Sequence, residues 1–216
     1  MSNEFGYIPE SPEQSFGNNK GIFTPTDIYD LTRADKYTNY GQLELIQTQT
    51  ASGSGLNIDF TNILETTYNV HLLILSGIFF AGTNKLPRMR LSNDSGTTFE
   101  AGTNYQEAYQ SMVASTFTEV KSTGQGYFNL MNNVGNEATE VGNSYTYLYN
   151  LGDSTKYSFC TYHSTSQTSG GTYFASTFGS GVYTQAETVN AIRIFEATAS
   201  FNITGTASLY GIKEYS

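Results

Sequence analysis

The sequence predicts an all-β protein, an antiparallel β-sandwich of the jelly-roll type preceded by an extended arm and one short helix. Two observations support this prediction. The 216 residues include 17 Tyr and 14 Phe but only 4 Pro, and aromatic and β-branched residues favour pleated, half-buried surfaces. From about residue 42 onward, apolar and polar residues alternate with a period of two, and stretches rich in Gly, Asn and Ser interrupt the alternation, as strands and turns require. No long internal repeat is evident, so a propeller or solenoid is not expected.

Residues 1–41 are predicted to form an arm that docks onto a neighbouring protein. Its first part mixes prolines and glycines with isolated apolar residues, and such a stretch cannot bury enough surface to fold alone. A short helix is expected at about residues 24–32, because Thr24 can cap it, Pro25 suits its first position and Asp27 can reach back to the cap. A disordered tail is the alternative for the first part. The candidate docking residues are Phe5, Tyr7, Ile8, Phe16, Phe23, Ile28 and Leu31.

Residues 42–216 are predicted to form the sandwich domain, with roughly ten or eleven strands. Residues 56–60 alternate as a half-buried strand does, and the nearly continuous apolar run at 68–76 is typical of a central strand buried on both faces. Residues 164–171 are predicted to be a polar loop, and 172–176 and 181–185 two short strands. The last two strands are expected at 198–204 and 207–213, joined by a tight hairpin turn at Gly205-Thr206.

Three tyrosines alternate along one predicted strand. Tyr145, Tyr147 and Tyr149 would share one face of it. We interpret this row as a core or inter-subunit face. The alternative is a glycan-binding surface, because exposed tyrosines can stack on sugars.

No group of residues predicts a catalytic, cofactor or metal site, and we expect a protein that is not an enzyme. The single cysteine, Cys160, excludes an intrachain disulfide and is expected to be buried and inert. His71 and His163 are isolated and lack the partners of a zinc site. Cys160 and His163 should face opposite sides of one strand. Asn93-Asp94-Ser95 is interpreted as a turn rather than a calcium site, and the scattered carboxylates cannot be paired from the sequence.

Charge and hydropathy bear on the expected partners and compartment. The net charge of −9 and the thin spread of basic residues argue against nucleic-acid binding, which needs clustered Lys and Arg. Arg88 and Arg90 are interpreted as a solvated strand face. The N-terminus lacks a basic region followed by an apolar run, and the longest apolar stretch is too short for a membrane span. We expect synthesis and retention in a cytoplasm and no membrane partner.

Several stretches resemble virion structural proteins of tailed phages, especially those that infect cyanobacteria and other marine bacteria. The stretches span most of the chain in order and are NKGIFTPTDIYDL (19–31), YNVHLL (68–73), RLSNDSG (90–96), NYQ (104–106) and ASLYGIK (207–213). None is a catalytic signature, so the specificity lies in their succession. The resemblance implies a β-sandwich in a homo-oligomer, with a trimer favoured, and leaves open whether it coats the capsid or belongs to the tail.

Three functions follow from these observations. The first is a capsid decoration or cement protein, located in the virion after assembly in the host cytoplasm, whose arm contacts the major capsid protein, other virion proteins or further copies. The second is a tail-fibre or receptor-binding module, in which loops such as 164–171 recognise a host surface glycan. The third, a hydrolase of surface polysaccharide, is disfavoured because no catalytic set is recognisable.

Overall fold

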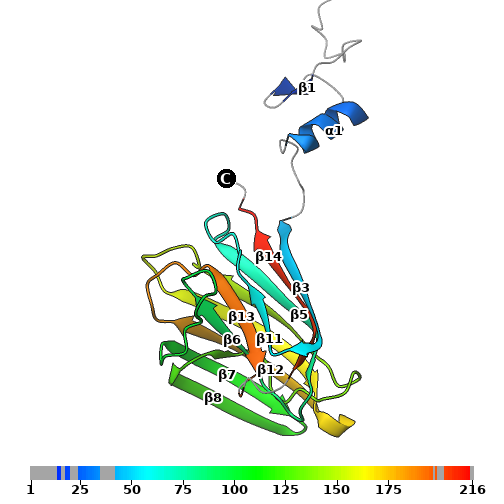
Figure 1. Cartoon of the computed structure of the whole chain (residues 1–216), viewed down its shortest axis with the longest axis vertical. Coiled ribbons are helices and arrows are strands. Elements are labelled where there is room, and N and C mark those ends of the chain that lie inside the picture. The colour runs from blue at the N-terminus through cyan, green and yellow to red at the C-terminus, as the bar shows by residue number, and fades with distance from the viewer. Residues whose placement is uncertain are drawn as a thin grey trace, which may run out of the picture. The chain divides into compact units, whose positions relative to one another are not determined.

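The computed structural model describes residues 14–15, 18–19, 24–34, 42–196, 198 and 202–214. The chain divides into two units, Met1–Gln42 and Leu43–Ser216, at a point one residue from the predicted domain boundary. We call the second the sandwich unit, and each unit is described by itself (Figure 1).

The first unit contains the predicted helix, α1 (Pro25–Arg33). Thr24 caps it: its hydroxyl accepts from the backbone N–H of Asp27 at 3.2 Å, and its own backbone N–H donates to the Asp27 carboxylate at 2.8 Å. Two short strands, β1 (Gln14–Ser15) and β2 (Asn18–Asn19), pair antiparallel. The docking candidates Ile28 and Leu31 are half-buried on α1. The other candidates lie outside the described residues: Phe5, Tyr7, Ile8, Phe16 and Phe23.

The sandwich unit contains two antiparallel sheets, which confirms the all-β, sandwich-like prediction. The eight-stranded sheet has the order β3-β14-β5-β10-β11-β12-β7-β8, and the four-stranded sheet has the order β4-β13-β6-β9. In Figure 1 the last strand, in red, lies beside β3 and β5 from the start of the unit. The strands are β3 (Leu43–Gly55), β4 (Asn57–Phe60), β5 (Val70–Phe80), β6 (Pro87–Ser92), β7 (Tyr105–Val113), β8 (Thr116–Gln125), β9 (Phe128–Asn129), β10 (Gly142–Tyr149), β11 (Ser158–Gln167), β12 (Phe174–Tyr183), β13 (Ala191–Glu196) and β14 (Ile203–Ile212). The jelly-roll topology is not confirmed, and β10, β11 and β12 form a simple meander.

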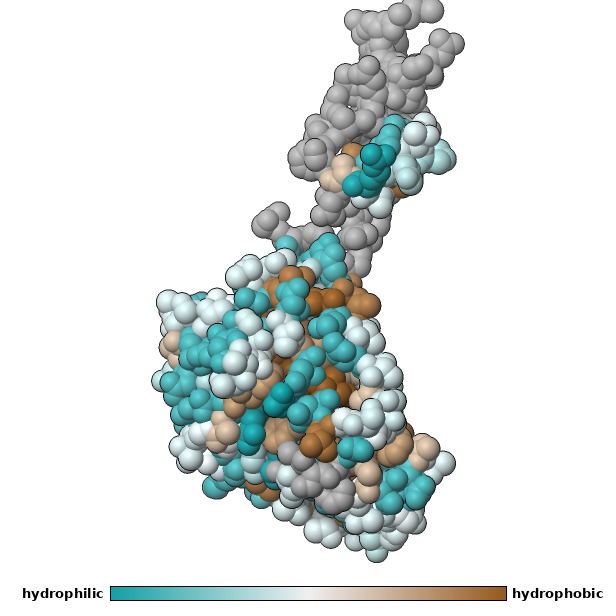
Figure 2. Space-filling view, in the orientation of Figure 1, coloured by the Kyte–Doolittle hydropathy of each residue, from teal (hydrophilic) through white to brown (hydrophobic). Residues whose placement is uncertain are grey.

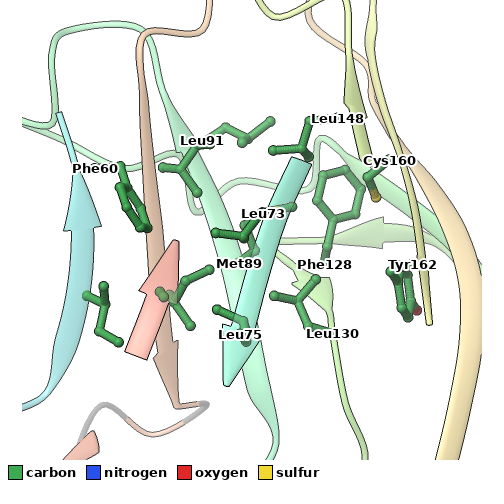
Figure 3. Packing of buried hydrophobic residues seen from close by; sticks show 14 of the residues in the cluster. Phe60, Leu73, Leu75, Met89, Leu91, Phe128, Leu130, Leu148, Cys160 and Tyr162 are labelled. Carbon is green, nitrogen blue, oxygen red and sulfur yellow. The ribbon is translucent and has the colours of Figure 1, made fainter. Parts of the chain in front are cut away.

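The core lies between the inward faces of the two sheets, and Figure 3 shows its packing. The alternation predicted for residues 56–60 is confirmed, because Ile58 and Phe60 of β4 are 4% and 0% exposed. The predicted central strand is also confirmed: β5 lies between β14 and β10, and its successive residues Leu72 and Leu73 are 6% and 0% exposed. Burial of the apolar face of each sheet is the main stabilising contribution of this core.

Three local predictions were wrong. Residues 164–167 continue β11, and only Ser169–Gly171 form a short 3₁₀ turn. The sequence looked like a loop because it is polar, but inward hydroxyls find partners; Ser166, for example, donates to the carbonyl of Asn132 at 2.7 Å. Residues 172–176 and 181–185 belong mostly to one strand, β12. Gly205 is not a hairpin turn: β14 runs through it, with a positive φ of 127° at a bulge in its pairing with β5.

Candidate binding face

Most of the large apolar side chains that the described part of the sandwich unit exposes lie on one surface. This surface is the side of the eight-stranded sheet that points away from the core, and we call it the outer face. Side chains alternate between the two sides of a sheet, so the strand registers assign each residue to a side. The exposed apolar residues on the outer face are Leu43, Leu45, Phe117, Tyr145, Phe159, Phe174 and Phe178. Figure 2 shows brown apolar areas between teal polar ones over the visible part of the sandwich unit.

The outer face carries very little charge. Among its described strand positions, only Glu119 and Lys121 bear a carboxylate or an ammonium group, and both lie on the edge strand β8. The chain as a whole has a net charge of −9. The acidic groups of the protein are therefore concentrated elsewhere, and this face is suited to neutral partners.

One end of the outer face is aliphatic. It spans β3, β14 and β5, where cross-strand partners present apolar side chains next to one another. Leu43 and Leu45 of β3 are 51% and 55% exposed. We call this region the aliphatic end. It consists of the exposed Leu43 and Leu45, the half-buried Val70, Ile74, Tyr210 and Ile212, and the buried Leu72.

A groove crosses the other part of the outer face. Its floor is a row of small side chains on adjacent strands, Thr161 of β11, Ser180 of β12 and Ala108 of β7. Larger residues on either side of this row stand higher and form two walls. One wall consists of Phe159 and Val182, which are cross-strand partners, and the other of His163 and Phe178, which also pair. The row continues to Tyr147 at one end of the groove and to Lys121 at the other.

Three adjoining hollows make up the groove. The hollow over Phe159, Ser180 and Val182 has a volume of about 830 Å³. A second one, beside Phe178 and Lys121, has a volume of about 430 Å³. The third, of about 710 Å³, lies over the three predicted tyrosines. The hollows share lining residues from one to the next, so they form one continuous depression that runs across the strands.

The predicted tyrosine row lies on the outer face, along β10. Tyr145 is 47% exposed, and Tyr147 and Tyr149 are half-buried, so this row does not belong to the core. Tyr145 meets His163 edge-on with ring centroids 5.8 Å apart, and His163 meets Phe178 in the same way at 6.5 Å. Edge-to-face pairs of this kind are favourable and hold the rings upright along the wall. The sequence could place the tyrosines on one strand but could not show that Phe159, His163 and Phe178 adjoin them.

The potentially reactive residues are kept apart. Cys160 is 1% exposed in the core, and burial raises the pKa of its thiol well above the ordinary value. His163 points to the opposite side of β11, where Ser176 lies 3.1 Å from its Nε2, so the two cannot act as a pair. His71 is fully buried with its Nε2 2.8 Å from the carbonyl of Ile63, and burial lowers its pKa.

The Asn93-Asp94-Ser95 segment forms the predicted turn. The Asp94 carboxylate accepts from the backbone N–H of Thr98 at 2.9 Å and from the Ser92 hydroxyl at 2.7 Å. The Thr98 hydroxyl also donates to this carboxylate and has the largest effect on it. Together these hydrogen bonds lower the pKa of Asp94 to about 2. Within the described ranges, no group of three or more His, Cys, Asp or Glu could hold a metal ion.

The outer side of the four-stranded sheet differs from the predicted solvated basic face. The Arg88 guanidinium lies over the ring of Tyr127 at 3.7 Å, and that of Arg90 over the ring of Phe195 at 4.5 Å. Arg193 forms a two-point ion pair with Asp59 at 2.7 Å. These guanidinium groups are thus held by aromatic rings and a carboxylate of the same chain.

Comparison with known proteins gives no relative: no protein-family model, no curated protein and no solved structure matches the chain. In the described part of the chain, no helix combines the length and the hydropathy that a bilayer span requires.

Proposed function

We propose that this protein is a non-enzymatic structural component of a tailed-phage virion, a capsid decoration protein that docks through its N-terminal arm and presents its sandwich unit. The sequence resemblance supports the virion assignment. The observation that carries the assembly role is the aliphatic end of the outer face. The largest exposed apolar patch of a soluble protein is often a site of interaction.

The occupant that best suits the aliphatic end is a second copy of the same chain. Each copy has a net charge of −9, so two copies repel each other wherever carboxylates approach. The strand positions of the aliphatic end carry no charged side chain, so two copies can meet there without that cost. A basic partner would instead be attracted to the acidic surfaces of the protein.

The arm supplies contact area that the aliphatic end lacks. Three strands about 4.8 Å apart and three outward rows about 6.8 Å apart cover roughly 300 Å². A stable interface buries about 800 Å² per partner. The proposal assigns the remaining area to the arm, whose spaced apolar residues can enter pockets of a neighbouring virion protein or a neighbouring copy.

Deletion of residues 1–23 tests the docking role of the arm. The shortened protein is expected to retain its sandwich fold, because every strand of the two large sheets begins after residue 42, and to lose binding to phage particles that lack the decoration protein. Particle occupancy is measured by co-sedimentation, and folding by circular dichroism. Occupancy equal to that of the full chain would show that the arm is not the docking segment.

Replacement of Leu45 by Glu tests self-association at the aliphatic end. In a symmetric dimer the new carboxylate would either face the same carboxylate of the other copy or lose its water without gaining a partner. The oligomer is therefore expected to dissociate. The association constant should fall at least about 100-fold, or roughly 3 kcal/mol. Sedimentation velocity measures the oligomeric state. The matched control is Thr50→Glu, an exposed outward position of β3 that pairs with Thr206 and lies beyond the three rows of the aliphatic end. If the L45E variant keeps the wild-type sedimentation coefficient, the interface lies elsewhere.

The second candidate, a receptor-binding module of the tail, is favoured by the groove. The groove lies over β10, β11, β12, β7 and β8, and it adjoins the aliphatic end where Tyr147 of β10 pairs with Leu72 of β5. The part of the groove over β11, β12, β7 and β8 lies beyond the strands of the aliphatic end, so both roles are compatible with one molecule.

A further inference from the structure

We infer that the groove on the outer face is a binding site for an extended, neutral oligosaccharide. This inference goes beyond the decoration role, because a subunit that presents its sandwich unit can bind a glycan wherever it sits on the particle. It rests on the shape of the groove, on the chemistry of its lining and on its lack of charge.

The groove has the dimensions of a chain-binding site. It crosses five neighbouring strands, from Tyr147 of β10 to Lys121 of β8. Four inter-strand spacings of about 4.8 Å give a length of about 19 Å. This length accommodates an oligosaccharide of several rings. A single sugar would fill only a part of the continuous depression.

The lining matches the two kinds of surface that a sugar ring presents. A pyranose has an apolar face of C–H groups and a rim of hydroxyl groups. The wall residues Phe159 and Phe178 are 44% and 48% exposed, so their rings are available to contact C–H groups. On the floor, Thr161 and Ser180 offer hydroxyl groups that can both donate and accept. The Thr161 hydroxyl lies 3.3 Å from the Tyr149 hydroxyl, which orients it.

The charge of the groove selects a neutral ligand. The β8 end of the groove carries opposite charges, Glu119 and Lys121. Glu107 also borders one hollow, but it is 4% exposed on the core side of β7, where its carboxylate accepts from the backbone N–H of Asn129 at 2.9 Å. The remaining lining bears no carboxylate or ammonium group. A polyanion would meet a chain with a net charge of −9 and gain at most one lysine contact. A neutral glycan carries no charge, so the net charge of the protein does not repel it.

The groove is unsuited to an extended peptide. Peptides that bind sheets add a strand at an exposed edge, where backbone groups are unpaired. Here β11, β12 and β7 are interior strands with neighbours on both sides, and their backbone groups pair within the sheet. A ligand in the groove meets side chains alone, which suits stacking and hydroxyl contacts.

The test uses the full chain on an array of neutral oligosaccharides of glucose, xylose, mannose, galactose and N-acetylglucosamine, followed by titration of the retained probe. Binding is read from tyrosine fluorescence, which has no tryptophan background because the chain contains no Trp. At least one probe is expected to bind. Phe159→Ala and Phe178→Ala should each weaken binding of this probe roughly tenfold, because one stacked aromatic ring contributes about a factor of ten in affinity.

A second kind of variant tests whether filling the groove prevents binding even when no aromatic ring is removed. Ala108→Phe places a bulky side chain on the exposed floor and is expected to abolish binding without removing any aromatic residue. Its matched control, Thr48→Phe, adds the same ring on β3 and should bind like wild type. The inference is overturned if no probe binds, or if binding survives in all three groove variants. Loss of self-association in the Phe159 and Phe178 variants, with no probe bound, would identify the groove as a protein interface. Particle occupancy is measured separately, so failure here leaves the decoration role standing.

Discussion

Replacement of Gly179 by alanine is expected to destabilise the sandwich unit by about 3 kcal/mol, which is at the upper end of the usual cost of overpacking. Gly179 lies in β12 opposite Tyr109 of β7. A Cβ on Gly179 would lie 2.8 Å from the carbonyl oxygen of Ala108 and 2.9 Å from the Cα of Tyr109. Both atoms belong to the backbone of β7, which is paired along its length with β12 and β8. The clash can therefore be relieved only by moving a strand.

Chemical denaturation with urea measures this effect, provided that the slope of the transition is unchanged. The matched control is Gly124→Ala on the edge strand β8, where the nearest atom to a new Cβ is 3.9 Å away. The control should stay within about 0.5 kcal/mol of wild type. Equal midpoints for the two variants would mean that β12 and β7 approach less closely than the structure indicates. The same substitution should also loosen the groove, because Ser180 and Ala108 of its floor adjoin the clash.

The predictable parts of this fold are those in which local sequence determines the outcome. The helix was predicted because Thr24, Pro25 and Asp27 each satisfy a requirement of a helix start, and the capping bonds form as expected. The half-buried strand β4 and the central strand β5 were predicted from the spacing of apolar residues. In these segments propensity, pattern and burial agree.

The predictions from the sequence were wrong where contacts between segments far apart in the chain, rather than local sequence, determine the structure. Residues 164–167 look like a loop, but Ser164 and Ser166 point inward and bond to distant backbone carbonyls. Gly205 looks like a turn, but no residue with a side chain fits there: its Cβ would lie 2.6 Å from the carbonyl oxygen of Gly77. A glycine required by close strand approach cannot be told from a turn glycine in a single sequence.

The candidate site was only partly predictable for a different reason. The tyrosine row could be found because its three residues lie on one strand. The groove combines side chains from β10, β11, β12, β7 and β8, and the adjacency of β12 and β7 joins segments about 70 residues apart in the chain. Strand order and register create the floor of Thr161, Ser180 and Ala108, and neither can be read from alternation alone.

Phe128 and Gly181 are expected to be energetically coupled, and Phe128→Ala alone should cost about 3–5 kcal/mol. Phe128 of β9 is 1% exposed and packs edge-to-face on Tyr105 with centroids 4.9 Å apart. A Cβ on Gly181 would lie 2.5 Å from the ring of Phe128 and 2.9 Å from the carbonyl oxygen of Gln106. The glycine thus leaves room for the ring beneath the strand that carries Ser180 of the groove floor.

A double-mutant cycle measures this coupling. Gly181→Ala is expected to destabilise the wild-type protein but to cost less in the Phe128→Ala background, where the new methyl group enters the space that the ring has left. A coupling energy of about 1 kcal/mol or more is expected between residues in such contact, reduced by the clash with Gln106 that remains. The control cycle pairs Gly181→Ala with Phe60→Ala, a buried ring that Figure 3 shows at the far side of the core from Phe128, and should be additive within about 0.5 kcal/mol. Additivity in both cycles would mean that the ring of Phe128 is not the reason why position 181 requires glycine. The close approach of the β7 backbone at Gln106 would then account for the glycine.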